Sequence, residues 1–161
     1  DRLEGHASVH SAGGQIAATD VSGHLMARTL GGDIEIVRSS GRVDAFSITG
    51  SVRIVAPTSK RLRANTNSGR ITYQGDFEPG GDYIMSTYSG DIDIVCAASA
   101  SFELDAKTVN GKLDNTVSLT PKHHPVTPLF SGSSLLGTRN RGNASVELTS
   151  FSGTIRVRQQ P

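Results

Sequence analysis

The sequence predicts an all-β, single-domain parallel β-solenoid (β-helix) of about seven coils, with one long insert before the last coil. Three observations predict this fold. Seven glycines recur in one column, an aliphatic residue follows each glycine by two positions, and a Ser or Thr precedes each by three. A pattern kept over seven repeats indicates one supersecondary unit stacked on copies of itself. The glycines are Gly14, Gly32, Gly50, Gly69, Gly90, Gly111 and Gly153.

Each repeat is predicted to be a strand, a corner and a second strand. Apolar residues stand seven and five positions before most of the glycines, and two and four positions after them, as Leu25, Ala27, Ile34 and Ile36 do around Gly32. A spacing of two is typical of a strand with one buried face. Glycine suits the corner because it reaches positive φ and lets the neighbouring coil approach. The hydroxyl column at the corner is expected to bond to the backbone and to itself.

The spacing of the repeats sets the expected boundaries. Like positions recur after 18, 18, 19, 21, 21 and 42 residues, which is too short for a crossover helix. Equivalent strands are therefore expected to pair in parallel, about 4.8 Å apart. We expect one domain over residues 1–161. It divides into regular 18-residue coils over 5–58, longer coils over 59–115, the insert over 116–142 and the final coil over 143–158.

Composition excludes some classes of function. The net charge is +1, from 16 basic and 15 acidic residues, which argues against a dedicated surface for nucleic acid or anionic membranes. No apolar run is long enough to span a bilayer. The lone cysteine, Cys96, is expected to be a small semi-buried hydrophobe rather than a reactive thiol. The chain begins at Asp1 with no signal peptide, so we expect it to be processed or cut from a longer protein.

Four segments of the chain carry a resemblance to a known family. They are Asn67-Ser68-Gly69-Arg70-Ile71, Tyr88-Ser89-Gly90-Asp91-Ile92, Val109-Asn110-Gly111-Lys112-Leu113 and Phe151-Ser152-Gly153-Thr154-Ile155. These resemble the "SGDI" repeats of a bacterial "putative adhesin" family, a domain family of unknown function. The resemblance covers essentially the whole chain. It implies a β-solenoid in an exported or cell-envelope protein, and it brings no catalytic residues.

Two pairs of charged or metal-ligating residues are candidate sites. Asp91 and Asp93 place two carboxylates on one strand face, about 7 Å apart, as some polysaccharide-degrading enzymes do. Cations expected on neighbouring coils, such as Arg70, oppose a general-acid role. His6 and His24 share a column, but no third zinc ligand follows them. Calcium-binding and ice-binding solenoid patterns do not match, and we expect no cofactor and no metal.

The insert is the one irregular segment, and long excursions from rigid scaffolds often bind partners. The alternative is a flap that packs on the side of the solenoid. A partner-binding role falls on His123, His124, Leu129, Phe130, Leu135, Leu136, Arg139 and Arg141.

Three functions remain open. The first is a non-enzymatic, envelope-associated or secreted module that acts as a scaffold or adhesin-like binder, with an envelope component, glycan or protein as partner. The second is a structural protein that assembles end to end through uncapped coils, because an uncapped solenoid exposes unpaired strand edges. Here Arg156, Arg158 and Pro161 are expected to protect the C-terminal end. The third, a carbohydrate-active β-helix enzyme, is the weakest.

Overall fold

All regular structure in the described part of the chain is β-strand. The computed structural model describes residues 3–55, 58–97, 100–115, 120–121 and 133–159. The strands are β1 (Leu3–Ser11), β2 (Ile16–Thr29), β3 (Ile34–Ser47), β4 (Val52–Val55), β5 (Arg61–Thr66), β6 (Ile71–Gly75), β7 (Asp82–Thr87), β8 (Ile92–Cys96), β9 (Phe102–Thr108), β10 (Leu113–Asn115), β11 (Thr120–Pro121), β12 (Ser133–Arg139), β13 (Ser145–Ser150) and β14 (Ile155–Gln159).

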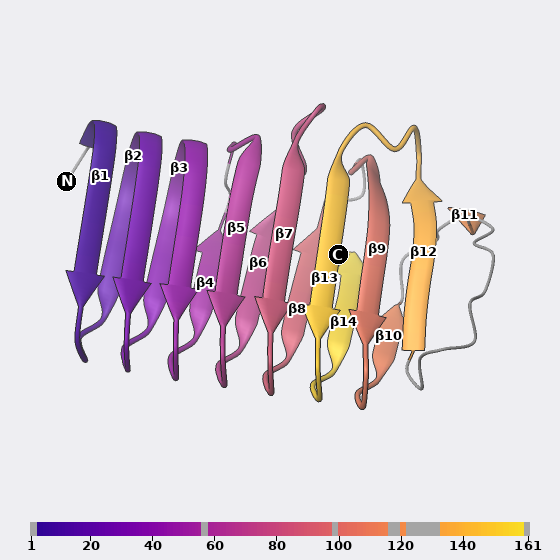
Figure 1. Cartoon of the computed structure of the whole chain (residues 1–161). Helices are drawn as coiled ribbons and strands as arrows, with labels where there is room; N and C mark the ends of the chain where they lie inside the picture. The colour runs from indigo at the N-terminus through magenta and orange to yellow at the C-terminus, as the bar shows by residue number, and fades with distance from the viewer. Residues whose placement is uncertain (1–2, 56–57, 98–99, 116–119, 122–132, 160–161) are drawn as a thin grey trace.

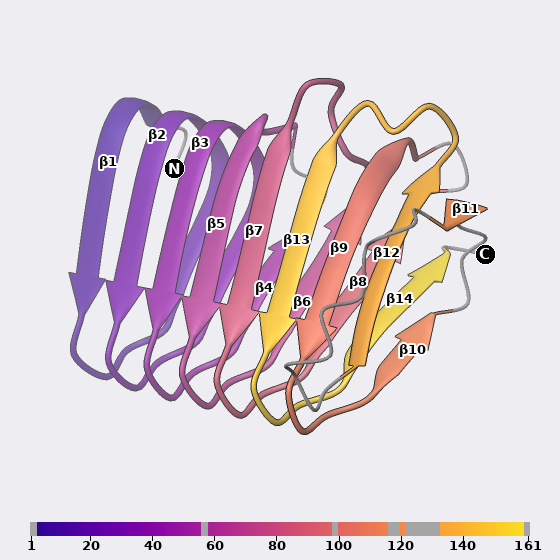
Figure 2. The same cartoon turned by 45° about the vertical axis from the view of Figure 1, so that its right-hand side comes forward.

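The strands form two facing rows, so the fold is β-solenoid-like. The front row in Figure 1 contains β1, β2, β3, β5, β7, β13, β9 and β12, and the back row contains β4, β6, β8, β14 and β10. β2 and β3 are long enough to bend from the back row into the front row, which Figure 2 shows from the side. Each strand of a row pairs with its neighbours in parallel, except at β12 and β11, so the sheet is mixed.

The predicted register is confirmed. Residues of one predicted column lie opposite each other on neighbouring strands, as Leu25 lies opposite Val43, and Val43 opposite Leu62. The predicted apolar columns fill the space between the rows. Leu25, Ile34 and Ile71 are completely buried, whereas Ala7, Val9 and Leu113 pack against the core only in part. The alternating pattern thus turns every second side chain of a strand toward the space between the two rows.

We expected two reasons for glycine at the corner, namely positive φ and close approach of the neighbouring coil. The structure confirms close approach, and the expectation of positive φ is wrong for this column. None of the seven corner glycines has positive φ; that conformation occurs instead at Gly5, Gly23 and Gly41, with φ of 96–99° at the opposite corner. The reason that holds is close approach. A Cβ added at Gly69 would overlap the carbonyl oxygen of Gly50 on the neighbouring strand pair. The same overlap with the preceding glycine of the stack would occur at Gly32, Gly50, Gly90, Gly111 and Gly153.

The hydroxyl column supports these corners through bonds to the backbone, as expected, whereas no bond joins two of its hydroxyls in the described chain. The Thr66 hydroxyl accepts a hydrogen bond from the Gly69 amide at 3.2 Å and donates to the Gly50 carbonyl at 3.0 Å. Ser47, Thr87, Thr108 and Ser150 make the same two bonds. Each hydroxyl therefore closes its own corner and bonds it to the neighbouring corner that precedes it in the stack.

The order of the strands differs from the expected order along the chain. The last repeat does not end the stack: β13 lies between β7 and β9, and β14 lies between β8 and β10. Figure 1 shows the yellow β13 between β7 and β9, and the yellow β14 between β8 and β10. The expectation that Arg156 and Arg158 protect an open end is wrong, because β14 is paired on both sides.

The insert covers one end of the stack. Its strand β12 pairs antiparallel with β9, from Ser133 opposite Thr108 to Arg139 opposite Phe102. Pro121 of β11 lies opposite Gly137 of β12 in a short antiparallel pairing. In its described part, the insert is therefore an end cap rather than a flap on the side of the solenoid. Within the residues that the structure describes, no helix has the length and hydropathy that a bilayer crossing requires.

Candidate functional site

A column of mostly apolar side chains lies exposed along the corner of the stack, two residues before each corner glycine. Leu30 is 57% exposed, Tyr88 58%, Val109 41% and Phe151 39%. The backbone holds the column in register, because every amide of the column after the first repeat donates to the neighbouring repeat, as Tyr88 N does to Thr66 O and Phe151 N to Thr87 O. In stacking order the column reads Ala12, Leu30, Ile48, Asn67, Tyr88, Phe151 and Val109.

A hollow of about 550 Å³ opens beside this column, and we call it the aromatic hollow. Tyr88 and Phe151 form its aromatic wall, with ring centroids 4.8 Å apart and planes within 2° of parallel. Phe46, which is 43% exposed, is the aromatic residue at its other end. The lining residues are Phe46, Ile48, Asn65, Thr66, Asn67, Ser86, Thr87, Tyr88, Val109, Thr149, Ser150 and Phe151.

None of the described residues that line the aromatic hollow is charged. Phe151 covers one face of the Tyr88 ring, and on the other side the next member of the column is Asn67. The side chains of Asn65 and Asn67 make no hydrogen bond to another described residue, so their amides are available to a ligand. The hollow therefore combines aromatic surface with amide and hydroxyl groups, as ligand sites commonly do.

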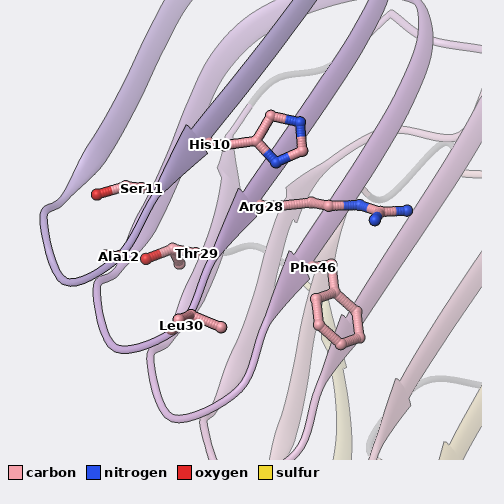
Figure 3. Close-up of a pocket in the computed structure, with 7 residues that line it drawn as sticks. All are labelled: His10, Ser11, Ala12, Arg28, Thr29, Leu30 and Phe46. Atoms are coloured by element: carbon pink, nitrogen blue, oxygen red, sulfur yellow. The ribbon is translucent and has the colours of Figure 1, made fainter.

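A second hollow of about 520 Å³ lies on the other side of Phe46, toward the N-terminus. Figure 3 shows His10, Arg28 and Phe46 projecting from successive strands on one side, with Leu30 at the corner below them. This hollow differs in charge, because Arg28 and His10 line it. Phe46 separates the two hollows, so a long ligand that passed this residue would meet a neutral part and a basic part.

The carboxylates considered for catalysis lie on the back row and contact arginines. Asp91 lies 3.6 Å from Arg70 and 3.8 Å from Arg156, while Asp93 lies 3.7 Å from Arg156 and 3.9 Å from Arg158. Oδ1 of Asp91 also accepts the backbone amide of Thr154 at 2.9 Å. Asp33 accepts the amide of Ser51 in the same way, at 2.8 Å. These aspartates connect neighbouring repeats of the stack.

The two histidines of one column form a chain of hydrogen bonds. His6 Nε2 lies 2.9 Å from His24 Nδ1, and His24 Nε2 lies 2.8 Å from Asp44 Oδ2. Arg42 Nε also donates to Asp44 Oδ2, at 3.2 Å. With both its ring nitrogens occupied, His24 is a poor metal ligand. Among the described residues no group of three or more His, Cys, Asp or Glu could hold a metal ion.

A family model described as Toastrack DUF4097 matches residues 6–158. The chain belongs to the Toastrack family. This match covers nearly the whole chain and agrees with the β-solenoid-like fold; the family is uncharacterised, and the match carries no adhesin function. No curated protein and no solved structure is similar enough to the chain to match it.

The insert residues considered for partner binding are only partly placed in this Toastrack domain. His123, His124, Leu129 and Phe130 lie outside the described residues. Leu135 and Leu136 belong to β12, opposite Ala106 and Asp105 of β9. Arg139 is 9% exposed and donates to Gln159 Oε1 at 3.0 Å, so it offers little surface to a partner. Arg141 is exposed in the turn that follows.

Cys96 of the Toastrack domain lies in the core, deeper than the semi-buried position that the sequence predicts. Its side chain is fully buried and its Sγ donates to the Arg158 carbonyl at 3.5 Å. Burial raises the pKa of the thiol, so the neutral form is favoured. This environment is that of an inert structural cysteine.

The aromatic hollow was missed at the level of sequence, although a signal for it exists. The column two before each glycine holds Leu30, Ile48, Tyr88, Val109 and Phe151 in five of seven repeats. These residues fall out of phase with the buried columns, because the alternation changes at the corner. Apolar residues that repeat at an outward position are a signal for a binding surface.

Proposed function

We propose that this Toastrack domain is a non-enzymatic binding module of the cell envelope or of the secreted fraction, and that its aromatic hollow binds a neutral carbohydrate chain. In this proposal a seven-coil solenoid supplies the rigid frame. The observation that carries the proposal is the uncharged lining with Phe46, Tyr88 and Phe151 exposed in it. The adhesin-like role expected from the sequence becomes recognition of a glycan.

The chemistry of the lining favours a sugar over other ligands. The face of an aromatic ring carries negative potential, which attracts the C–H groups on the apolar face of a sugar ring. Amides such as Asn65 and Asn67 both donate and accept, which suits sugar hydroxyls. A nucleic acid or an acidic polymer would instead require cations, which this hollow lacks.

Rigidity supports the same proposal. Tyr88 and Phe151 project from corners whose backbones are hydrogen-bonded to the neighbouring repeats of the stack. A surface that is ordered before binding loses little conformational entropy on binding. Neighbouring parallel strands lie about 4.8 Å apart. The hollow therefore extends along the stack in the way that a chain-like ligand requires.

The test is titration with neutral oligosaccharides, namely cellohexaose, maltohexaose and chitohexaose, followed by calorimetry and by chemical-shift changes at Tyr88. We expect Tyr88→Ala to weaken the binding of the best of these at least about fivefold, the equivalent of about 1 kcal/mol. Leu30→Ala, an equally exposed apolar residue of the same column outside the hollow, is the matched control. If no neutral oligosaccharide binds, or if Leu30→Ala weakens binding as much as Tyr88→Ala does, the proposal is wrong.

A second candidate function, assembly through open strand edges, is favoured by one observation at β1. No described strand pairs with the outer edge of β1, while β12 covers β9 at the opposite end. Pairing of two β1 edges would join two copies into a closed dimer. Ser8→Pro, which places a residue without an amide hydrogen in β1, would abolish such pairing.

A further inference from the structure

The outer face of the front row is divided into a basic and an acidic half. We call this surface the front face; it is formed by the outward side chains of β1, β2, β3, β5, β7, β13 and β9 (Figure 1). Alternation along each strand sends three side chains outward, such as Arg61, Arg63 and Asn65 from β5. The front face adjoins the aromatic hollow and shares with it the outward residues nearest the corner, namely Phe46, Asn65, Ser86 and Thr149.

The charges separate along the stack. The basic half, on β1, β2, β3 and β5, carries Arg28, Arg42, Arg61 and Arg63 against Asp44, a net charge of +3 with its histidines neutral. The acidic half, on β7, β13 and β9, carries Asp82, Glu103, Asp105 and Glu147 against Lys107, a net charge of −3. The net charge of the chain is near zero, but the front face therefore carries two patches of equal and opposite charge.

Several of these charges have no ion-pair partner among the residues that the structure describes. Asp44 is satisfied by His24 and Arg42, and Asp105 lies 3.4 Å from Lys107. In contrast, no ion pair joins any of five other charges to a residue that the structure describes. These five are Arg28, Arg61, Arg63, Asp82 and Glu147.

We propose that two copies of the chain associate through their front faces, with the basic half of each copy over the acidic half of the other. A two-fold axis parallel to the strands, at the boundary between β5 and β7, produces this arrangement. A two-fold axis along the stack would instead place like halves together. Residues at the boundary then meet across the axis, so that Arg61 of each copy faces Asp82 of the other. The contact is isologous, which closes the assembly at two copies.

The size of the front face suits such a contact. Seven strands about 4.8 Å apart, each presenting about 20 Å of its length, give a face of about 700 Å². A standard stable interface buries about 800 Å² on each partner. A moderate, salt-dependent dimer is the expected result, because complementary charges mainly set orientation and association rate.

A second copy accounts for more of the surface than an anionic polymer does. A polymer would bind only the basic half, beside Asp44, and would leave the acidic half unexplained. The second copy uses both halves. Pairing of open β1 edges is the other route to a dimer, and salt distinguishes the two, because backbone hydrogen bonds of a strand pair are not screened as exposed charges are.

The test is sedimentation equilibrium of the full chain at several salt concentrations. We expect a monomer–dimer equilibrium that weakens at least about tenfold when NaCl is raised from about 0.05 M to about 0.5 M. Two charge-reversed variants sharpen it: Arg61→Glu/Arg63→Glu makes both halves acidic, and Asp82→Arg/Glu147→Arg makes both basic. Each variant alone should be monomeric, and an equimolar mixture should form a heterodimer.

The control reverses two exposed cations of the back row, Arg53→Glu/Lys112→Glu, with circular dichroism to verify folding of every variant. This control should dimerise as the wild type does and should not form a heterodimer with the basic variant. A wild type that is monomeric at low salt overturns the proposal. A dimer that is insensitive to salt and to both charge reversals also overturns the proposal. If Ser8→Pro abolishes that dimer, the contact is assigned to the β1 edge. Equal heterodimer formation by the control also overturns it, because the attraction would then be net charge alone.

Discussion

At the scale of single residues, the corners depend on backbones that nearly touch. The hydroxyl of Thr66 and the glycine three residues later act as one unit, because the hydroxyl binds the glycine amide and the carbonyl of the next corner. The absence of a side chain at Gly69 leaves room for the carbonyl of Gly50. Since no corner glycine has positive φ, the requirement for glycine at this corner is a packing requirement.

This packing requirement predicts a large effect of Gly69→Ala. The added methyl group would overlap the backbone of the neighbouring repeat. Because backbone cannot rotate away as a side chain can, the two repeats must move apart. We expect the free energy of unfolding to fall by about 3 kcal/mol or more, measured by urea denaturation. Gly13→Ala is the control, since a Cβ there meets no atom within 4 Å, and it should change stability by less than about 1 kcal/mol. Equal effects of the two substitutions would contradict the packing argument.

At the scale of elements, the sequence predicts the columns well and the cap not at all. The register of every parallel pair follows from the columns, because a strand with one buried face cannot shift by one residue without turning its apolar side chains outward. β12 carries no such repeat, since the run from Ser133 to Arg139 pairs antiparallel and has no corner glycine behind it. Nothing in a parallel repeat predicts that its insert returns in the opposite direction to cover the edge of β9.

The cap predicts what happens when β12 is removed as a strand. Replacing residues 133–139 by an equal length of Gly-Ser repeats removes the partner of β9 and exposes its backbone donors and acceptors. We expect concentration-dependent aggregation, measured by light scattering, because an open flat edge pairs with other chains. A variant with alternating Thr and Val over the same seven positions keeps strand propensity and should stay dispersed. Aggregation of both variants, or of neither, would argue against capping by β12.

At the scale of the whole molecule, a periodic sequence determines register but leaves order open. Every repeat offers the same columns, so β9 could pair with β7 as well as with β13. Charge favours the adopted order at two positions, although the same order places Glu147 opposite Asp105. Direct contact of the two repeats would place Asp93 beside Asp114, and Asp82 beside Glu103, and like charges opposite each other are destabilising. With the final repeat inserted, Arg156 lies between the first pair and Ser145 between the second.

The inserted position of the final repeat predicts unequal effects of two similar truncations. Removing residues 1–18 takes one repeat from an end of the stack and breaks one set of contacts. Removing residues 143–161 takes β13 and β14 from the middle, which breaks two sets and, if the gap closes, brings the like charges together. Because stability in a stacked repeat is roughly a sum of neighbour contacts, we expect the second truncation to lower the Tm much more and to broaden thermal unfolding.

Glu103→Gln/Asp114→Asn in the chain that ends at residue 142 separates the two causes. If like charges oppose closure of the gap, neutralising them should recover part of the lost Tm, measured by circular dichroism, while the same pair of substitutions in the full chain should not stabilise it. Recovery would mean that charge selects the order of repeats that the columns leave open. An equal loss of Tm in the two truncations, with no recovery, would mean that the final repeat contributes no more than a terminal one, and the charge explanation for its position would have to be abandoned.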